Sequence, residues 1–114
     1  MAQARITAPK RAKRGEIIEI RALLQHPMET GYRRSSEGAL LPRDLVRRFT
    51  CHFVETGKTG AGDLVFAASL HAAIAANPYF SFDLRASTSG TLHFRWEGDN
   101  GFSHREQVSV AVSD

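Results

Sequence analysis

The sequence predicts an all-β protein, an immunoglobulin-like antiparallel β-sandwich of about seven strands. Apolar and polar side chains alternate through several short segments of the 114 residues, and such alternation is typical of strands with one buried face. Glycine, asparagine and proline separate these segments and are suited to turns. No helical periodicity extends beyond two turns. One-sided strands at this spacing favour two antiparallel sheets packed face to face.

The first 14 residues predict a basic and partly flexible arm, and residues 15–114 predict a single β-sandwich domain. Residues 5–7 would provide a seventh strand by pairing at a sheet edge. A basic terminal segment is most often a solvated one. The arm carries a cluster of cations, Arg5, Lys10, Arg11, Lys13 and Arg14.

Four segments in the middle of the chain place apolar residues on one face of a strand. The glycine-rich connection at 56–62 is suited to a hairpin. Residues 70–76 could add one helical turn, which Asn77 and Pro78 would end. The apolar faces consist of Ile18, Ile20, Ala22 and Leu24, then Phe49, Cys51 and Phe53, then Leu64, Phe66, Ala68 and Leu70, and finally Phe80, Phe82, Leu84 and Ala86.

Residues 91–112 predict a β-hairpin. The turn at 97–101 contains glycine and asparagine, which tolerate the positive φ that tight reversals require. Successive side chains of a strand point to opposite faces, so each strand of the hairpin has one apolar face. These faces consist of Leu92, Phe94 and Trp96, then Val108, Val110 and Val112.

The composition is that of a folded globular domain, with 42% hydrophobic and 24% charged residues. The net charge is +3, and a second basic group follows the first at Arg33, Arg34, Arg43, Arg47 and Arg48. Such clusters can neutralise phosphates. No helix-turn-helix or zinc-ligand spacing accompanies them, so a nucleic-acid partner is not predicted. An acidic protein partner would explain the same charge through electrostatic steering.

The connection from His26 to Asp44 lacks alternation and is rich in turn formers. A connection this long in a compact domain is usually functional or disordered. Methionine and tyrosine are adaptable contact residues. We therefore predict partner docking here, with an ordered crossover loop as the alternative. The candidate docking residues are Pro27, Met28, Tyr32 and Arg33.

Cys51 and His52 suggest a thiol nucleophile beside an imidazole base, but neighbours in a strand point to opposite faces. Cys51 lies between Phe49 and Phe53 on an apolar stripe, where a thiol acts as a small hydrophobe. We therefore predict a structural, buried thiol, and the alternative is a sulfur transferase that uses Cys51. The histidines show no metal-ligand spacing, and the glycines form no phosphate cradle. The residues predict no enzyme, no cofactor and no metal site.

No segment is long and apolar enough to predict a membrane span. The amino terminus lacks the apolar central region of a secretory signal. A single cysteine leaves no internal disulfide. Taken by themselves, these features favour the cytosol.

Three segments add a more specific signal. They are His26-Pro-Met-Glu-Thr-Gly-Tyr-Arg33, Ala73-Ile-Ala-Ala-Asn-Pro-Tyr-Phe-Ser-Phe82 and Phe94-Arg-Trp-Glu-Gly-Asp-Asn-Gly101. In this order they closely resemble the SoxZ family, the small subunit of the SoxYZ sulfur-carrier complex. The resemblance covers residues 14–112.

The resemblance implies a noncatalytic subunit that scaffolds a SoxY-like carrier in a heterodimer, during oxidation of thiosulfate or other reduced sulfur. The carrier's own carboxyl-terminal cysteine would hold the sulfur intermediates, and other sulfur-oxidation enzymes would bind transiently. The resemblance also implies a periplasmic location, reached by export together with the carrier. A generic immunoglobulin-like binding module, as in adhesins or chaperones, is the alternative function. Self-association of the isolated chain stays open.

Overall fold

A computed structural model describes residues 3–71 and 76–114. Within these ranges the chain forms strands and one 3-10 turn, which confirms the predicted all-β class. The predicted helical turn at 70–76 falls mostly on residues outside the described ranges. The elements are β1 (Gln3–Thr7), β2 (Arg11–Lys13), β3 (Ile17–Gln25), β4 (Val46–Glu55), β5 (Asp63–Ser69), β6 (Tyr79–Arg85), β7 (Gly90–Gly98), η1 (Asp99–Gly101) and β8 (Ser103–Ser113).

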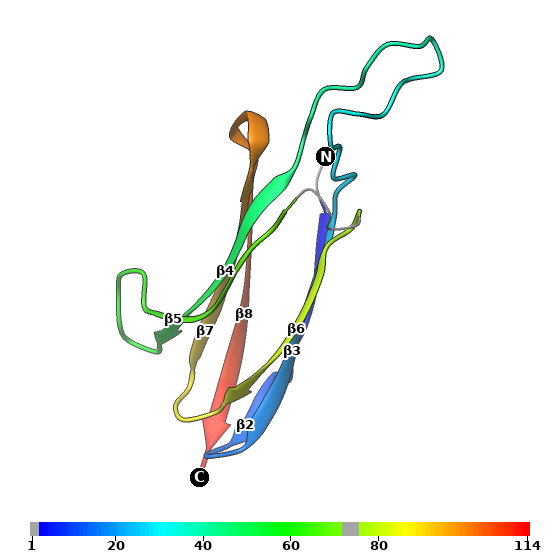
Figure 1. The fold of residues 1–114 in the computed structure, drawn as a ribbon. Coiled ribbons are helices and arrows are strands. Elements are labelled where there is room, and N and C mark those ends of the chain that lie inside the picture. The colour runs from blue at the N-terminus through cyan, green and yellow to red at the C-terminus, as the bar shows by residue number, and fades with distance from the viewer. Residues whose placement is uncertain (1–2, 72–75) are drawn as a thin grey trace.

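The strands form two sheets, one of three strands in the order β1-β3-β6 and one of five in the order β2-β8-β7-β4-β5. Neighbouring strands run antiparallel except for β2 and β8, which are parallel. Figure 1 shows the sheets as two layers that face each other. This arrangement confirms the predicted immunoglobulin-like sandwich.

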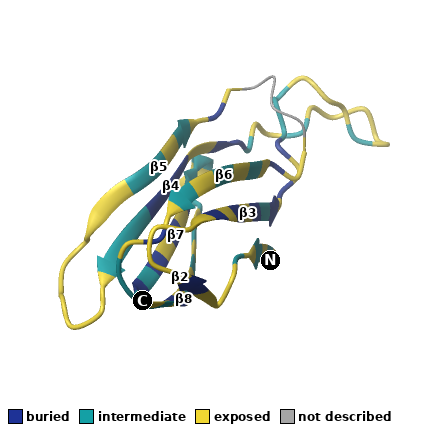
Figure 2. Ribbon diagram, turned by 90° about the horizontal axis from the view of Figure 1, so that it is seen from below, coloured by how far each residue is buried: buried dark blue, intermediate teal, exposed yellow. Residues whose placement is uncertain are grey.

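The core lies between the two sheets. Phe49 of β4 stacks on Phe80 of β6 with ring centroids 4.8 Å apart, and Phe66 of β5 stacks on Phe82 of β6 at 4.5 Å. Aromatic pairs at these distances bury large apolar areas, so the stacks join the sheets. Figure 2 shows buried residues along β3, β4 and β7. The largest fully buried side chains are Trp96, Phe49, Phe94, Ile20, Leu24, Leu45, Leu92, Val46 and Cys51.

The first 13 residues contribute an edge strand to each sheet. Residues 3–7 pair antiparallel with β3, which confirms the predicted edge pairing of residues 5–7. Residues 11–13 pair with β8, a strand that the sequence did not predict. The segment Arg11-Ala-Lys13 has a single apolar residue, too few for an alternation signal. The flexibility of residues 1–14 and the division of the chain at residue 14 stay predictions.

A β-bulge in β5 corrects one predicted apolar face. Cys51 of β4 is opposite Phe66, but His52 is opposite Leu64, which leaves Val65 unpaired. A bulge residue reverses the alternation beyond it. Val65 therefore packs against the core and Leu64 is 52% exposed, so the predicted inward position of Leu64 is wrong.

The hairpin of β7 and β8 matches its prediction, with Trp96 fully buried and η1 at the turn. Asn100 in this turn has a φ of 59°, a left-handed conformation that asparagine tolerates better than most residues. None of the described residues forms a helix that is both long and apolar enough to cross a membrane.

Candidate partner-docking surface

Residues 26–44, hereafter the excursion, connect β3 to β4. Figure 1 shows the excursion projecting from one end of the sandwich, with the C-terminus at the opposite end. The excursion extends the molecule along its longest dimension, 60 Å against 24 and 21 Å. Most of its residues are exposed, as the yellow segments in Figure 2 show.

Backbone pairing closes the base of the excursion. Glu29 and Asp44 form an antiparallel bridge in which each N–H donates to the other's carbonyl oxygen at 2.8 Å. Beside this bridge, the Sδ atom of Met28 accepts a hydrogen bond from the N–H of Val46 at 3.3 Å. The φ of Met28 is 53°, in the left-handed region that such residues rarely adopt. The hydrogen bond from Val46 and the bridge between Glu29 and Asp44 therefore hold Met28 in this conformation.

His26 holds the start of the excursion, directly after β3, against the sandwich. Its Nδ1 atom accepts the N–H of Met28 at 3.0 Å, and its own N–H donates to Oδ1 of Asn77 at 3.0 Å. The ring is buried and meets Phe102 edge to face at 5.1 Å. Because Nδ1 accepts, a neutral ring carries its proton on Nε2, and this atom lies 3.7 Å from Oδ1 of Asp44.

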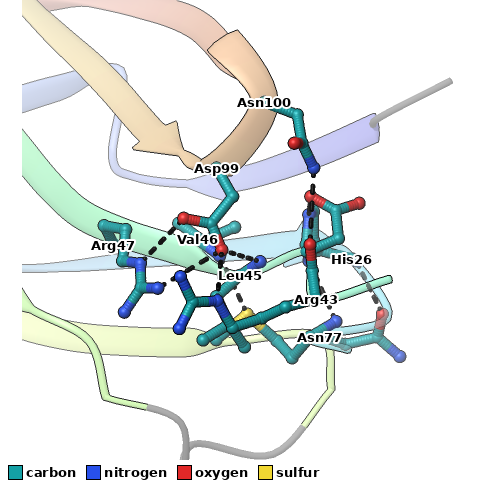
Figure 3. A network of polar contacts seen from close by, with 10 residues as sticks. His26, Arg43, Leu45, Val46, Arg47, Asn77, Asp99 and Asn100 are labelled. Atoms are coloured by element: carbon teal, nitrogen blue, oxygen red, sulfur yellow. Dashed lines mark hydrogen bonds and ion pairs between the residues drawn. The ribbon is translucent and has the colours of Figure 1, made fainter. Parts of the chain in front are cut away.

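Asp99, in the turn between β7 and β8, holds the other end of the excursion, directly before β4. Its carboxylate accepts hydrogen bonds from the N–H of Leu45 and from Nε of Arg47, both at 3.0 Å, and lies 3.7 Å from Nε of Arg43 (Figure 3). Asn100 adds a hydrogen bond from its amide to the carbonyl oxygen of Arg43 at 3.4 Å. The hydrogen bond from Arg47 is the main reason why the pKa of Asp99 lies below its usual range.

The far end of the excursion is a tight reversal that presents apolar groups to solvent. Arg34 and Leu40 form a bridge, and the N–H of Ser35 donates to the carbonyl oxygen of Ala39 at 2.7 Å. Near this reversal Tyr32 is 88% exposed and Leu40 is 55% exposed. An exposed tyrosine and leucine on a braced arm resemble the aromatic and aliphatic anchors of protein interfaces.

The four predicted docking residues differ in their exposure to solvent. Pro27 and Tyr32 are exposed. The Arg33 side chain is 66% exposed and forms an ion pair with Glu29, which lowers the pKa of that carboxyl. The predicted docking role of Met28 is corrected, because Met28 is 5% exposed and belongs to the core. Its side chain therefore stabilises the base of the excursion and offers no surface for docking.

Sequence reasoning did not select Leu40. Leu40 lies in a stretch without alternation, so no pattern indicates which of its apolar residues face solvent. In the structure Leu40 pairs with Arg34 near the far end of the excursion and is 55% exposed.

Cys51 is fully buried, as predicted. Burial raises the pKa of its thiol from 9.0 to about 12. The thiolate is the reactive form of cysteine, so this thiol is poorly suited to nucleophilic attack at neutral pH. Across residues 3–71 and 76–114, no three histidine, cysteine, aspartate or glutamate side chains gather into a group that could hold a metal ion.

A comparison with protein families identifies the chain. Residues 6–109 match the family described as sulphur oxidation protein SoxZ. The chain belongs to the SoxZ family. This membership confirms the resemblance drawn from the three sequence segments, and it assigns the chain to sulfur oxidation. A search of curated proteins gave no match.

Solved structures share the fold of this SoxZ family member. A superoxide reductase (neelaredoxin) from Ignicoccus hospitalis has a TM-score of 0.76 at 18% identity, over 96% of this chain and 80% of that chain. A putative superoxide reductase from Thermotoga maritima has a TM-score of 0.76 at 15% identity, over 97% and 86%. The sulfur carrier protein SoxY from Chlorobium limicola f thiosulfatophilum has a TM-score of 0.64 at 13% identity, over 97% and 79%. At these identities the likeness concerns the fold alone.

Proposed function

We propose that this chain is a noncatalytic subunit that pairs with a SoxY-like carrier and scaffolds it during the oxidation of thiosulfate or other reduced sulfur. Membership of the SoxZ family, over residues 6–109, is the observation that carries the proposal. In this assignment the covalent chemistry takes place on the carrier's own cysteine.

The position of Cys51 supports a noncatalytic role. A sulfur carrier must expose its thiol to other proteins, and the thiol needs a cationic or polar neighbour that favours the thiolate. Cys51 instead lies on the inner face of β4 with no exposed surface, and desolvation raises its pKa to about 12. A sulfur atom bound to Cys51 would have no space and no route to a second enzyme.

The excursion supplies the docking surface in this proposal. Interfaces are enriched in tyrosine and arginine, and a few central residues carry most of the binding free energy. Tyr32 and Arg33 present such side chains on a loop whose base is fixed by His26 and Asp99, and Leu40 adds exposed apolar surface to the same loop. A braced arm loses little conformational entropy on binding.

The proposal is tested by co-expression with the cognate SoxY-like subunit. We expect a stoichiometric complex on gel filtration, and mass spectrometry after exposure to thiosulfate and the other pathway proteins should show added sulfur on the carrier alone. Separate elution of the two chains, or added sulfur on Cys51, would contradict the proposed function.

Substitutions in the excursion test the docking surface. Tyr32→Asp places a charge at the interface, where an unpaired buried charge is unfavourable, and should weaken pairing about tenfold or more. Ile17→Asp is the control, because Ile17 is another exposed apolar residue, 53% exposed, at the start of β3, the end of that strand opposite the excursion. Both variants should keep the thermal midpoint of the parent. Equal loss of affinity in the two variants would move the interface away from the excursion.

We further propose a periplasmic location, reached by export together with the carrier, and transient contacts with other enzymes of the pathway. Both are what the resemblance to the SoxZ family implies. Cell fractionation should recover the chain in the periplasm when the carrier gene is intact and in the cytosol when it is deleted. Recovery in the cytosol of both strains would refute co-export.

A further inference from the structure

The five-stranded sheet has a hollow on its outer face, the face turned away from the three-stranded sheet. The hollow has a volume of about 770 Å³ and is bordered on one side by Gly60 and Ala61 of the β4–β5 hairpin. Its floor consists of the outward side chains of β4, β7 and β8, which alternate with the core residues of the same strands. The described strands form only two sheets, and no third sheet packs on this face.

The lining of this hollow has more arginines than glutamates, Arg48, Arg95 and Arg105 against Glu97 and Glu106. Arg95 of β7 is directly opposite Arg105 of β8, whereas Arg48 of β4 is directly opposite Glu97, two residues from Arg95 along β7. Like charges directly opposite each other destabilise a sheet. Their juxtaposition therefore has a cost that a bound anion would offset.

The acidic residues of the hollow compensate only part of this charge. Glu97 pairs with Arg95 at 3.1 Å. Glu106 is hydrogen-bonded to His104 at 2.7 Å. Of the described carboxylates, none lies within 4.0 Å of a guanidinium nitrogen of Arg48 or Arg105.

Two histidines extend the same surface. His52 and His93 are directly opposite each other in the β4–β7 ladder, and both line the hollow. Each can donate a hydrogen bond from a ring nitrogen without being charged. The histidines therefore add hydrogen-bond donors to those of the arginines over several rows of the sheet.

We propose that this hollow, which is separate from the excursion, binds an acidic segment of a polypeptide in extended conformation, through Arg48, Arg95 and Arg105. Neighbouring strands lie about 4.8 Å apart, so the backbone positions of Arg105 and Arg48 are separated by two strand spacings, about 10 Å or more. A single tetrahedral oxyanion would bind these guanidinium groups together only if the arginine side chains converged on one point. Carboxylates two residues apart on an extended chain are separated by about 7 Å, and a row of them matches the spread of the arginines.

The test uses the full chain and a short fluorescent peptide of alternating glutamate and alanine. Fluorescence anisotropy at low ionic strength should show binding, because unscreened charge pairs are strongest there. A peptide with glutamine in place of glutamate should not bind. The double variant Arg48→Gln/Arg105→Gln should bind the acidic peptide about tenfold more weakly, because each substitution removes a guanidinium that makes a charge-assisted hydrogen bond to the peptide.

The matched control is Arg5→Gln/Arg11→Gln, which removes the same charge from the exposed positions of the edge strands β1 and β2. This control should bind as the parent does, and all variants should keep the parent's thermal midpoint. Three results would overturn the proposal: no binding, equal weakening in the control, or displacement of the peptide by sulfate where chloride of equal ionic strength has no effect. The last result would indicate a small-oxyanion site. None of these measurements involves a carrier subunit, so their outcome is independent of the proposed function.

Discussion

Cys51 and Asp99 show how their surroundings determine the chemistry of single residues in this protein. Cys51 has only apolar neighbours on the inner face of β4, and desolvation raises its pKa to about 12. Asp99 accepts hydrogen bonds from Arg47 and from the backbone of Leu45, which lower its pKa. The buried group is held neutral and inert, and the carboxylate is held charged as a structural anchor.

Cys51 should react with a thiol reagent only after unfolding. A rise in pKa from 9.0 to about 12 lowers the thiolate fraction at neutral pH about a thousandfold, and burial also blocks access. Labelling with a chromogenic disulfide should be slow in buffer and fast in guanidinium chloride. Rapid labelling of the native chain would favour the alternative of a sulfur transferase that uses Cys51.

Asp99→Asn should change how stability depends on pH. The folded-state pKa of Asp99 is below its ordinary value of 3.8, so the stabilisation by the charged form is complete above about pH 5 and is lost as the pH falls through the folded pKa. The thermal midpoint of the variant should therefore lie below that of the parent at pH 7, and the difference should shrink below about pH 4.

Asp63→Asn is the matched control for this measurement, because Asp63 is exposed at the start of β5 and has no ion pair among the described residues. Its midpoint should follow that of the parent across the pH range. A constant difference for Asp99→Asn down to pH 3 would show that the charge of Asp99 is not the cause.

At the scale of elements, the excursion depends on the turn of the β7–β8 hairpin. Gly98 ends β7 opposite Val46, and its N–H donates to the carbonyl oxygen of Phe102 at 3.0 Å. The N–H of Asp99 donates to the carbonyl oxygen of Leu45 at 2.8 Å. The two segments approach so closely that a Cβ atom on Gly98 would lie 2.4 Å from the oxygen of Leu45.

Gly98→Ala should therefore separate the turn from the start of β4. Relief of this overlap needs a backbone shift, for which we expect a loss of about 1–3 kcal/mol of unfolding free energy. Chemical denaturation measures this loss. Hydrogen exchange should also become faster at Leu45, whose N–H donates to Asp99.

Ser103→Ala, at the exposed start of β8, is the control and should be close to neutral. An unchanged free energy of unfolding for Gly98→Ala would mean that the close approach is not needed for the fold.

At the scale of the whole molecule, the first 13 residues complete both sheets. β1 covers one edge of β3 and β2 covers one edge of β8. Uncovered edge strands present unpaired backbone groups that can pair with other chains. β1 and β2 become the edge strands in their place, and because they are short and carry Arg5, Arg11 and Lys13 they are poor templates for such pairing. Ala12 of β2 also belongs to the core.

Removal of residues 1–13 should lower stability and promote self-association. The loss of partly buried Ile6 and buried Ala12 removes about 2 kcal/mol of apolar burial, which corresponds to a fall in thermal midpoint of about 10 °C. Light scattering should show concentration-dependent oligomers. A monomeric truncated chain with the parent's midpoint would show that residues 1–13 are a dispensable arm.

The sequence predicts the strands of this protein better than their pairing. Alternation correctly places Ile18, Ile20 and Phe49 in the core, because the period of a strand is fixed by backbone geometry. It misplaces Leu64, because the bulge at Val65 has no sequence marker. It also misses β2, which is too short to show a period and exists through its pairing with β8.

The proposed docking surface could be predicted only in outline. The length and composition of residues 26–44 indicate a connection with a function. They do not reveal that Met28 is buried or that Leu40 is exposed. They also do not reveal that Asp99, 54 residues further along the chain, accepts a hydrogen bond from Leu45. These properties depend on contacts between distant segments.

The sequence by itself determines the fold class, the final hairpin, the inert environment of Cys51 and, through three segments, the SoxZ family. Each of these is a local property, set by strand period, turn chemistry or a short motif. The tertiary structure alone decides which residues of the excursion are exposed and which cations share the outer hollow. Arg48, Arg95 and Arg105 become neighbours only when β4, β7 and β8 align in register, and register depends on the whole sandwich.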